Sequence, residues 1–134
     1  MFFGSRHNLI LPGPALNMGD GWETKRRRGL GHDWTIVKLG TAGAIRRVEV
    51  DTRHFKGNAP GMCSLEGCVA EGAAVETLAA GADWRQVLAR VAVRPDARQT
   101  FEDEVSAIGA VTHVRFNIFP DGGVARLRLF GRLR

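Results

Sequence analysis

The amino-acid sequence predicts a single all-β domain, an antiparallel sandwich or jelly roll. Its length of 134 residues suits one domain rather than two. Its 44% apolar and 25% charged residues are typical of a globular chain. Short alternating runs of apolar and polar residues are separated by turn residues, drawn from 17 Gly and 5 Pro, and few segments have a helical period.

We expect residues 1–20 to form a loop or an edge segment, because they are rich in Gly and Pro. Their apolar run, 9–11, is ended by Pro12. No apolar stretch approaches the roughly 18–20 residues of a membrane span, and the start has no signal-peptide pattern. Two Cys are too few for a disulfide scaffold. These features predict a cytoplasmic protein with no membrane partner.

Two strands are predicted in the first half of the chain. Residues 35–39 form a β-rich run that Gly40 closes, and residues 45–51 form another. In the second run Ile45 is out of phase with Val48 and Val50. Either a bulge lies near residues 46–47 or the buried part starts at Val48.

Two further strands are predicted near the end of the chain. In residues 112–119, Val114, Phe116 and Ile118 are expected to face inward, and the residues between them outward. Residues 124–130 alternate as well, with Arg126 and Arg128 on one face. The intervening residues 120–123, Pro-Asp-Gly-Gly, predict a tight hairpin.

Helix is expected in two places at most. Asp83 is a candidate N-cap for a short helix over residues 84–90, after which the chain returns to strand character. A weaker helical candidate covers the acidic residues 101–108.

The segment 17–34 has the composition of an ordered loop that lines a cavity. It combines two Trp, several acids, four consecutive basic residues and a His between glycines. In such a loop Trp supplies apolar walls, Arg binds anions, and acids transfer protons. The alternative is a structural loop whose Arg residues pair with its own acids.

The basic charge admits two kinds of partner. The net charge is +5, and 16 of the 19 basic residues are Arg, which holds planar carboxylates and phosphates through two hydrogen bonds. The basic run 25–28 is only four residues long, it is flanked by acids, and the chain has no Tyr for base stacking. A small anionic substrate is therefore favoured, and no nucleic-acid partner is expected.

A second polar cluster, residues 51–58, follows a predicted strand and is expected at one rim of the sheet. His54 suits proton transfer, although a loop histidine without a chemical role is the commoner case. The four His do not have the spacing of zinc ligands. The sequence therefore neither indicates nor excludes a divalent metal. Cys63 and Cys68 have no acid–base partner nearby and are expected to be ordinary core or surface thiols.

His113, Arg115 and Asn117 share the outward face of one predicted strand. If that face lines a concavity, Arg115 and Asn117 could hold a carboxylate or a urea group. If it is solvated, they are ordinary surface residues, which is the more frequent situation.

Several blocks, in order and spacing, resemble the allantoicase family over nearly the whole chain. They are NMGDGWET at 17–24, RRRG at 26–29, GHDW at 31–34, VDT at 50–52, HFKGN at 54–58, HVR at 113–115, NIFPDGG at 117–123 and RLR at 126–128. The resemblance implies hydrolysis of allantoate to ureidoglycolate and urea in purine breakdown.

The resemblance also implies an architecture of two jelly-roll repeats of the galactose-binding-like kind. This chain, residues 1–134, is similar to one repeat, the second, and is expected to lack the first strand of that repeat. Gln99 stands where the family pattern would have a His. An unpaired sheet edge favours self-association, so a homo-oligomer is expected.

The resemblance and the chemistry of the substrate together suggest roles for individual residues. Glu23, Asp33 and His54 are the candidates for acid and base, because the departing urea must be protonated and water must be activated. Arg26, Arg27 or Arg115 would bind the carboxylate. Lys56 and Asn58 would hold the ureido oxygen, and Trp22 would exclude water. The remaining candidates for substrate binding are His32, His113, Asn117 and Asp121.

The alternative is a non-catalytic jelly-roll repeat. Such a repeat binds a ligand or only packs against its neighbour. The acids that lie beside Arg in the sequence favour the enzyme, because a pure anion site has little use for Glu23 and Asp33.

Overall fold

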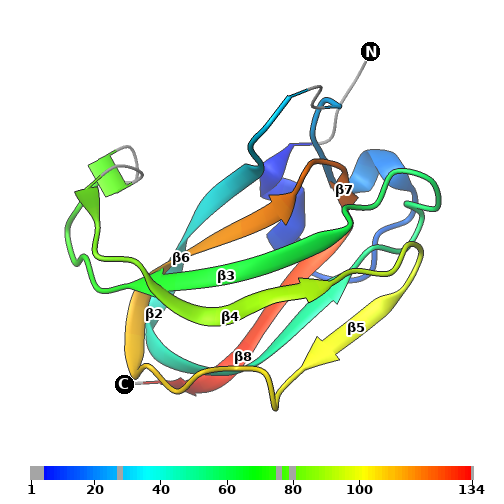
Figure 1. The fold of residues 1–134 in the computed structure, drawn as a ribbon. Helices are drawn as coiled ribbons and strands as arrows, with labels where there is room; N and C mark the ends of the chain where they lie inside the picture. The colour runs from blue at the N-terminus through cyan, green and yellow to red at the C-terminus, as the bar shows by residue number, and fades with distance from the viewer. Residues whose placement is uncertain (1–4, 27–28, 75–76, 79–80, 134) are drawn as a thin grey trace.

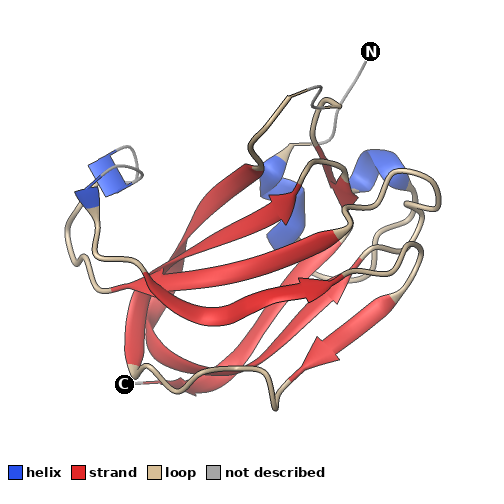
Figure 2. Ribbon diagram, in the orientation of Figure 1, coloured by secondary structure: helices blue, strands red, loops and turns tan. Residues whose placement is uncertain are grey.

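Antiparallel strands make up almost the whole structure, a computed structural model that describes residues 5–26, 29–74, 77–78 and 81–133 (Figures 1 and 2). Two short 3-10 helices precede the strands: η1 (Arg6–Ile10) and η2 (Met18–Asp20). The strands are β1 (Trp22–Glu23), β2 (Asp33–Asp51), β3 (Met62–Cys68), β4 (Arg85–Ala92), β5 (Arg98–Phe101), β6 (Ala110–Phe119), β7 (Gly123–Val124) and β8 (Arg126–Leu133).

Strand β2 belongs to both layers of the structure. Its first part pairs with β6, which continues through β3 to β4, and its second part pairs with β8 and β5. The predicted strands 35–39 and 45–51 are thus confirmed, but Gly40 does not end the first of them. The register with β8 shifts between Ile45 and Arg47, which confirms the bulge.

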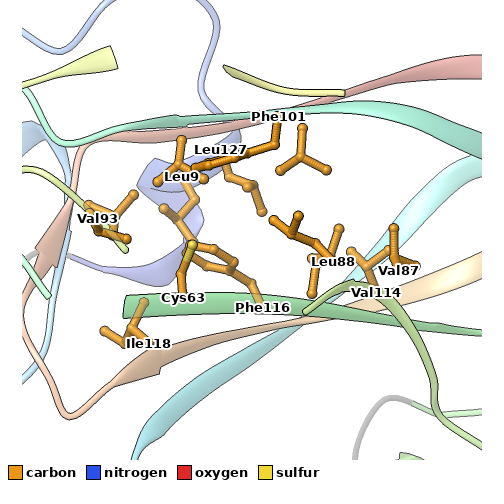
Figure 3. Close-up of a cluster of buried hydrophobic side chains, with 14 of the residues drawn as sticks. Leu9, Cys63, Val87, Leu88, Val93, Phe101, Val114, Phe116, Ile118 and Leu127 are labelled. Atoms are coloured by element: carbon orange, nitrogen blue, oxygen red, sulfur yellow. The ribbon is translucent and has the colours of Figure 1, made fainter. Parts of the chain in front are cut away.

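The core lies between the two layers (Figure 3). From β6, Val114, Phe116 and Ile118 are fully buried, as the alternation predicts, and they meet Leu127 of β8 and Phe101 of β5. The opposite face of β6 is not an open surface. On it His113 and Asn117 are only 1% and 3% exposed, and the Asn117 side chain is bonded to those of His32, Ser64 and Glu66, whereas Arg115 between them is half-buried.

The hairpin predicted at residues 120–123 is wrong. Strands β6 and β8 do not pair with each other; both pair with β2, in different parts of it. The turn instead carries the chain from one layer to the other, and on the way β7 pairs with β1. Sequence spacing indicated a turn correctly, but the partners of the flanking strands are chosen by long-range contacts.

Both helix predictions are wrong as well. Residues 85–92 form β4, which buries Val87 and Leu88 and pairs with β3. Residues 101–108 contain the end of β5 and a turn, and Val105 forms a bridge to Leu88. Pairing with β3 in the first segment, and with β2 and Leu88 in the second, outweighs the weak helical propensity of these short segments.

The N-terminal segment is held against β8 by arginines, and its Leu9 is buried in the core. Arg126 is 3% exposed and donates to the carbonyls of Gly13 and Asp20 and to the Asp20 carboxylate. Arg128 donates to the carbonyls of Leu9 and Leu11. These bonds give the predicted loop a fixed path. Within the described residues, no helix is long and apolar enough to cross a membrane.

Candidate functional site

Three loops that are far apart in the sequence meet at one end of the structure. The backbone N–H of Gly123 donates to the Asn58 carbonyl across 2.8 Å, and that of Thr24 donates to Gly122 across 3.0 Å. The Thr24 hydroxyl accepts from the N–H of Gly122 at 3.2 Å. A Cβ on Gly123 would lie 2.0 Å from the Phe55 ring, so only glycine fits there. This close packing brings three blocks of the sequence pattern together.

Glu23 and Asn58 form the polar centre of this loop end. The Asn58 side-chain amide donates to Glu23 Oε2 across 2.5 Å, and both side chains are half-buried. Lys56 is exposed on the same loop, and Asp121 is half-buried on the 120–122 turn. A carboxylate held by an amide donor can accept a proton from water or hold the donor groups of a ligand.

Trp22 does not line this end of the molecule. It is 6% exposed, belongs to the core, and its ring lies 6.2 Å from that of Phe116. The expectation that Trp22 is a cavity wall is therefore not met. The side chain instead anchors β1, so that the neighbouring Glu23 points the other way along the strand.

A groove of about 380 Å³ lies on the outer face of the layer formed by β4, β3, β6 and the start of β2. Cross-strand pairing explains its lining, because Ser64 is opposite Asn117, and Glu66 is opposite Arg115. The lining residues are His32, Trp34, Ser64, Glu66, Gln86, Leu88, Arg90, Arg115, Asn117 and Phe119. Three predicted site residues, His32, Arg115 and Asn117, are thus brought together.

Glu66 organises the polar groups of the groove. Its carboxylate accepts from Arg115 Nε and Nη2 at 2.8 and 3.1 Å, and from Asn117 Nδ2 at 2.9 Å. Asn117 also lies 3.1 Å from His32 Nε2. Partial burial raises the pKa of Glu66, but the hydrogen bonds from Arg115 and Asn117 outweigh it and hold that pKa below its ordinary value.

Aromatic rings and a second arginine complete the groove. Arg115 lies over Trp84 at 4.8 Å, and Arg90 lies over Phe119 at 3.9 Å. The His32 ring is 4.6 Å from that of Phe119. The Arg115 guanidinium forms an ion pair with Glu66 within the groove. Arg90, in contrast, is exposed to solvent.

Sequence reasoning missed Glu66 and Arg90. Glu66 carried a usable signal, since Ser64 and Glu66 alternate with Cys63 and Leu65, which are buried. Arg90 was missed because residues 84–90 were predicted as a helix. With the helical period, the sequence does not place Arg90 on the same face as the residues of the neighbouring strand.

Three other predicted residues lie elsewhere. Asp33 is opposite Ile118 in the β2–β6 register, so it faces the opposite side of the sheet from Trp34. His54 has φ of 79°, and its Nε2 donates to the Ala15 carbonyl at 2.7 Å. His113 is outside the groove, with Nδ1 2.8 Å from the Thr112 hydroxyl, and burial lowers its pKa.

The remaining predictions concern the basic run, the thiols and a metal. Arg26 is exposed, whereas Arg27 and Arg28 lie outside the described residues. Cys63 and Cys68 are buried, as expected of core thiols, and burial raises the pKa of Cys63 to about 12. In the parts of the chain that the structure describes, no three His, Cys, Asp or Glu side chains gather as metal ligands would.

A family model and relatives similar in sequence agree on one protein family. The family model described as "Allantoicase repeat" matches residues 1–134. "Probable allantoicase 1" of Burkholderia mallei is 50% identical over 132 residues, which are 98% of this chain and 39% of that protein. "Probable allantoicase" of Pseudomonas aeruginosa (strain LESB58) is 52% identical over 131 residues, which cover 97% and 40%. The chain thus spans about two fifths of the length of these relatives.

Solved structures agree. The crystal structure of an allantoicase from Saccharomyces cerevisiae has a TM-score of 0.82 and 38% identity, covering 97% of this chain and 37% of that one. The C-terminal domain of a chitobiase from Bacteroides fragilis has a TM-score of 0.70 at 12% identity, covering 97% and 82%, and shows likeness of fold alone. The predicted all-β, galactose-binding-like jelly roll is confirmed.

Proposed function

Because the chain belongs to the allantoicase family, we propose that it is one repeat of an enzyme that hydrolyses allantoate to ureidoglycolate and urea. The observation that carries the proposal is the match of the allantoicase repeat over the whole chain, with relatives named as allantoicases at about 50% identity. The resemblance of its sequence blocks favours the second of the two repeats.

Allantoate has a carboxylate and two ureido groups on one carbon. Hydrolysis breaks one bond from that carbon to nitrogen and joins a water oxygen to the carbon. The leaving nitrogen takes up a proton and departs as urea, and water gives up a proton. The reaction thus needs a cation for the carboxylate, a general acid and a general base.

Glu23 is our candidate for the general base. Its carboxylate is half-buried and receives a hydrogen bond from Asn58 at 2.5 Å, which fixes its direction. Arg26, three residues further along, is exposed and suits the substrate carboxylate. Lys56 and Asp121 lie on the two adjoining loops and can contact ureido groups.

The groove supports the same substrate class. His32 and Asn117 offer an imidazole and an amide, and Arg90 adds a cation. His32 also lies on the segment that joins Glu23 to β2, at the end of β6 where the 120–122 turn begins. We therefore include His32, Asn117 and Arg90 in the proposed site and leave out Asp33, His54 and His113.

Assembly and location are part of the proposal. A homo-oligomer in the cytoplasm, without a nucleic-acid partner, is what the sequence favours. Light scattering measures the assembly, and oligonucleotide binding that weakens steeply with salt would contradict the last expectation.

The test is urea release from allantoate by the purified chain, with and without a chelator. Turnover supports a complete site in this repeat, and loss of turnover with chelator would add a divalent metal to it. If the folded chain is inactive, the same assay is applied to a protein with both repeats. Absence of turnover there overturns the proposed function in favour of a non-catalytic repeat.

A further inference from the structure

A chain of hydrogen bonds in the groove runs from Arg115 through Glu66 and Asn117 to His32. We infer that Glu66 is a positioning residue: through Asn117, it holds His32 in the tautomer that carries its proton on Nε2. The basic lone pair is then on Nδ1. The catalytic consequence of this inference rests on the proposed function, but the tautomer itself can be measured without substrate.

The first step is the direction of the Asn117 amide. Glu66 is bonded to both Nε and Nη2 of Arg115, as an ionised carboxylate is. An ionised carboxylate only accepts hydrogen bonds. Asn117 must therefore turn its NH₂ group toward Glu66, and the 2.9 Å distance between Nδ2 and Oε1 fits that bond.

The second step is the tautomer of His32. With its NH₂ group toward Glu66, Asn117 presents Oδ1 to His32 Nε2 across 3.1 Å. An amide oxygen only accepts, so the proton of a neutral His32 must be on Nε2. The Ser64 hydroxyl, 3.1 Å from Asn117 Nδ2, does not decide the matter because a hydroxyl both donates and accepts.

The support for His32 comes from strands, although His32 itself precedes β2 on a loop. Ser64 and Glu66 of β3 face Asn117 and Arg115 of β6 in a regular register. Their side chains therefore have fixed positions, and a site residue on a loop receives its orientation from a rigid sheet. A neutral imidazole with a defined basic nitrogen is what a proton-transfer step requires.

The tautomer is measured by ¹⁵N NMR of the imidazole nitrogens at about pH 8, where an ordinary imidazole is neutral. The signals of His32 are assigned by their loss in His32→Gln. We expect Nε2 to resonate as the protonated nitrogen and Nδ1 as the unprotonated one. A wild-type His32 protonated on Nδ1 would overturn the inference, whatever happens to any variant.

Two variants test the part played by Glu66. A Gln at residue 66 both donates and accepts, so Asn117 can take either orientation, and Glu66→Gln should give a mixture of His32 tautomers. Ser64→Ala removes the other partner of Asn117 Nδ2 and should keep the Nε2–H tautomer. Circular dichroism confirms that both are folded. An unchanged single tautomer in folded Glu66→Gln would overturn the role of Glu66.

Activity separates this inference from the proposed function. In an active protein, Glu66→Gln should lower kcat about tenfold or more and change KM little. An unchanged kcat would overturn the positioning role. If wild-type protein with both repeats releases no urea but His32 has the Nε2–H tautomer, the proposed function fails and the tautomer assignment stands.

Discussion

The side-chain amide of Asn58 donates to Glu23 Oε2 across 2.5 Å, which joins two residues 35 positions apart. Each lies in a separate block of the sequence pattern, and the third block, 117–123, closes the same end of the structure through Gly122 and Gly123. The contact depends on the folded chain and on close backbone packing. The position of the Glu23 carboxylate, the proposed general base, therefore depends on the packing of these three loops.

The first prediction concerns the Glu23 carboxylate. Glu23→Gln keeps the size of the side chain and removes its basicity, so urea release should fall by about 10²- to 10⁴-fold. Thermal unfolding should change little, because the amide can still accept from Asn58. Glu102→Gln is the matched control, since that carboxylate is 59% exposed and outside the site. Near-normal turnover in Glu23→Gln would remove Glu23 from the mechanism.

The second prediction concerns the packing of the loops. Gly123→Ala places a Cβ 2.0 Å from the buried Phe55 ring and should lower the free energy of unfolding by about 2–3 kcal/mol. Gly57→Ala, in the same loop as Phe55, places its Cβ in open space and should change stability little. Denaturant unfolding measures both. Equal stabilities would show that Phe55 moves freely and that the loop end is not closely packed.

The sequence predicted the fold class and the strands that alternate clearly. Residues 112–119 alternate clearly, so their assignment as a strand required no knowledge of partners, but the burial of His113 and Asn117 on the face expected to be outward was not predicted. The pairing of β6 and β8 could not be predicted in this way, because both pair with β2 and a turn between two strands does not specify a hairpin. For β4, the pairing with β3 determines the structure, and the short helical pattern is misleading.

The candidate site was predicted in part. Glu23 and Asn58 were both named, and so were His32, Arg115 and Asn117, which the groove brings together. Trp22 differs from these residues in its surroundings, because its ring packs in the core beside Phe116 and lines no cavity at this end. Arg115 was one of three arginines predicted to bind the substrate carboxylate, and the structure pairs it with Glu66. The register between neighbouring strands determines which arginine pairs with which acid. That register cannot be deduced from the amino-acid composition of a segment.

The third prediction concerns His54. His54→Ala removes the bond to the Ala15 carbonyl and should cost about 1 kcal/mol of stability. His54→Gly also removes it but relieves the positive φ of 79°, so it should be more stable than His54→Ala by about 1 kcal/mol. Both should keep most of their turnover. A loss of activity beyond 100-fold with unchanged stability would restore His54 as an acid–base residue.

The fourth prediction is a pH dependence from His113. Burial lowers the pKa of His113 in the folded chain below the value of 6.5 for a free imidazole, so the unfolded chain binds more protons in the interval between the two. The free energy of unfolding should therefore fall as pH decreases from about 6.5 toward the folded pKa, with Lys38 opposing protonation. His113→Gln should lose this dependence. Parallel curves for the two proteins would contradict the prediction.

The sharing of β2 between the layers has a consequence for how the chain opens. Neither layer can detach as a separate cooperative unit, because the same 19-residue strand pairs with β6 in one layer and lies between β8 and β5 in the other. Amide protons in the paired parts of β2, residues 33–38 and 43–51, should therefore exchange only through global unfolding, while those of the loops exchange through local openings. A domain built around such a shared strand is expected to unfold as one cooperative unit, with only its loops open to local fluctuation.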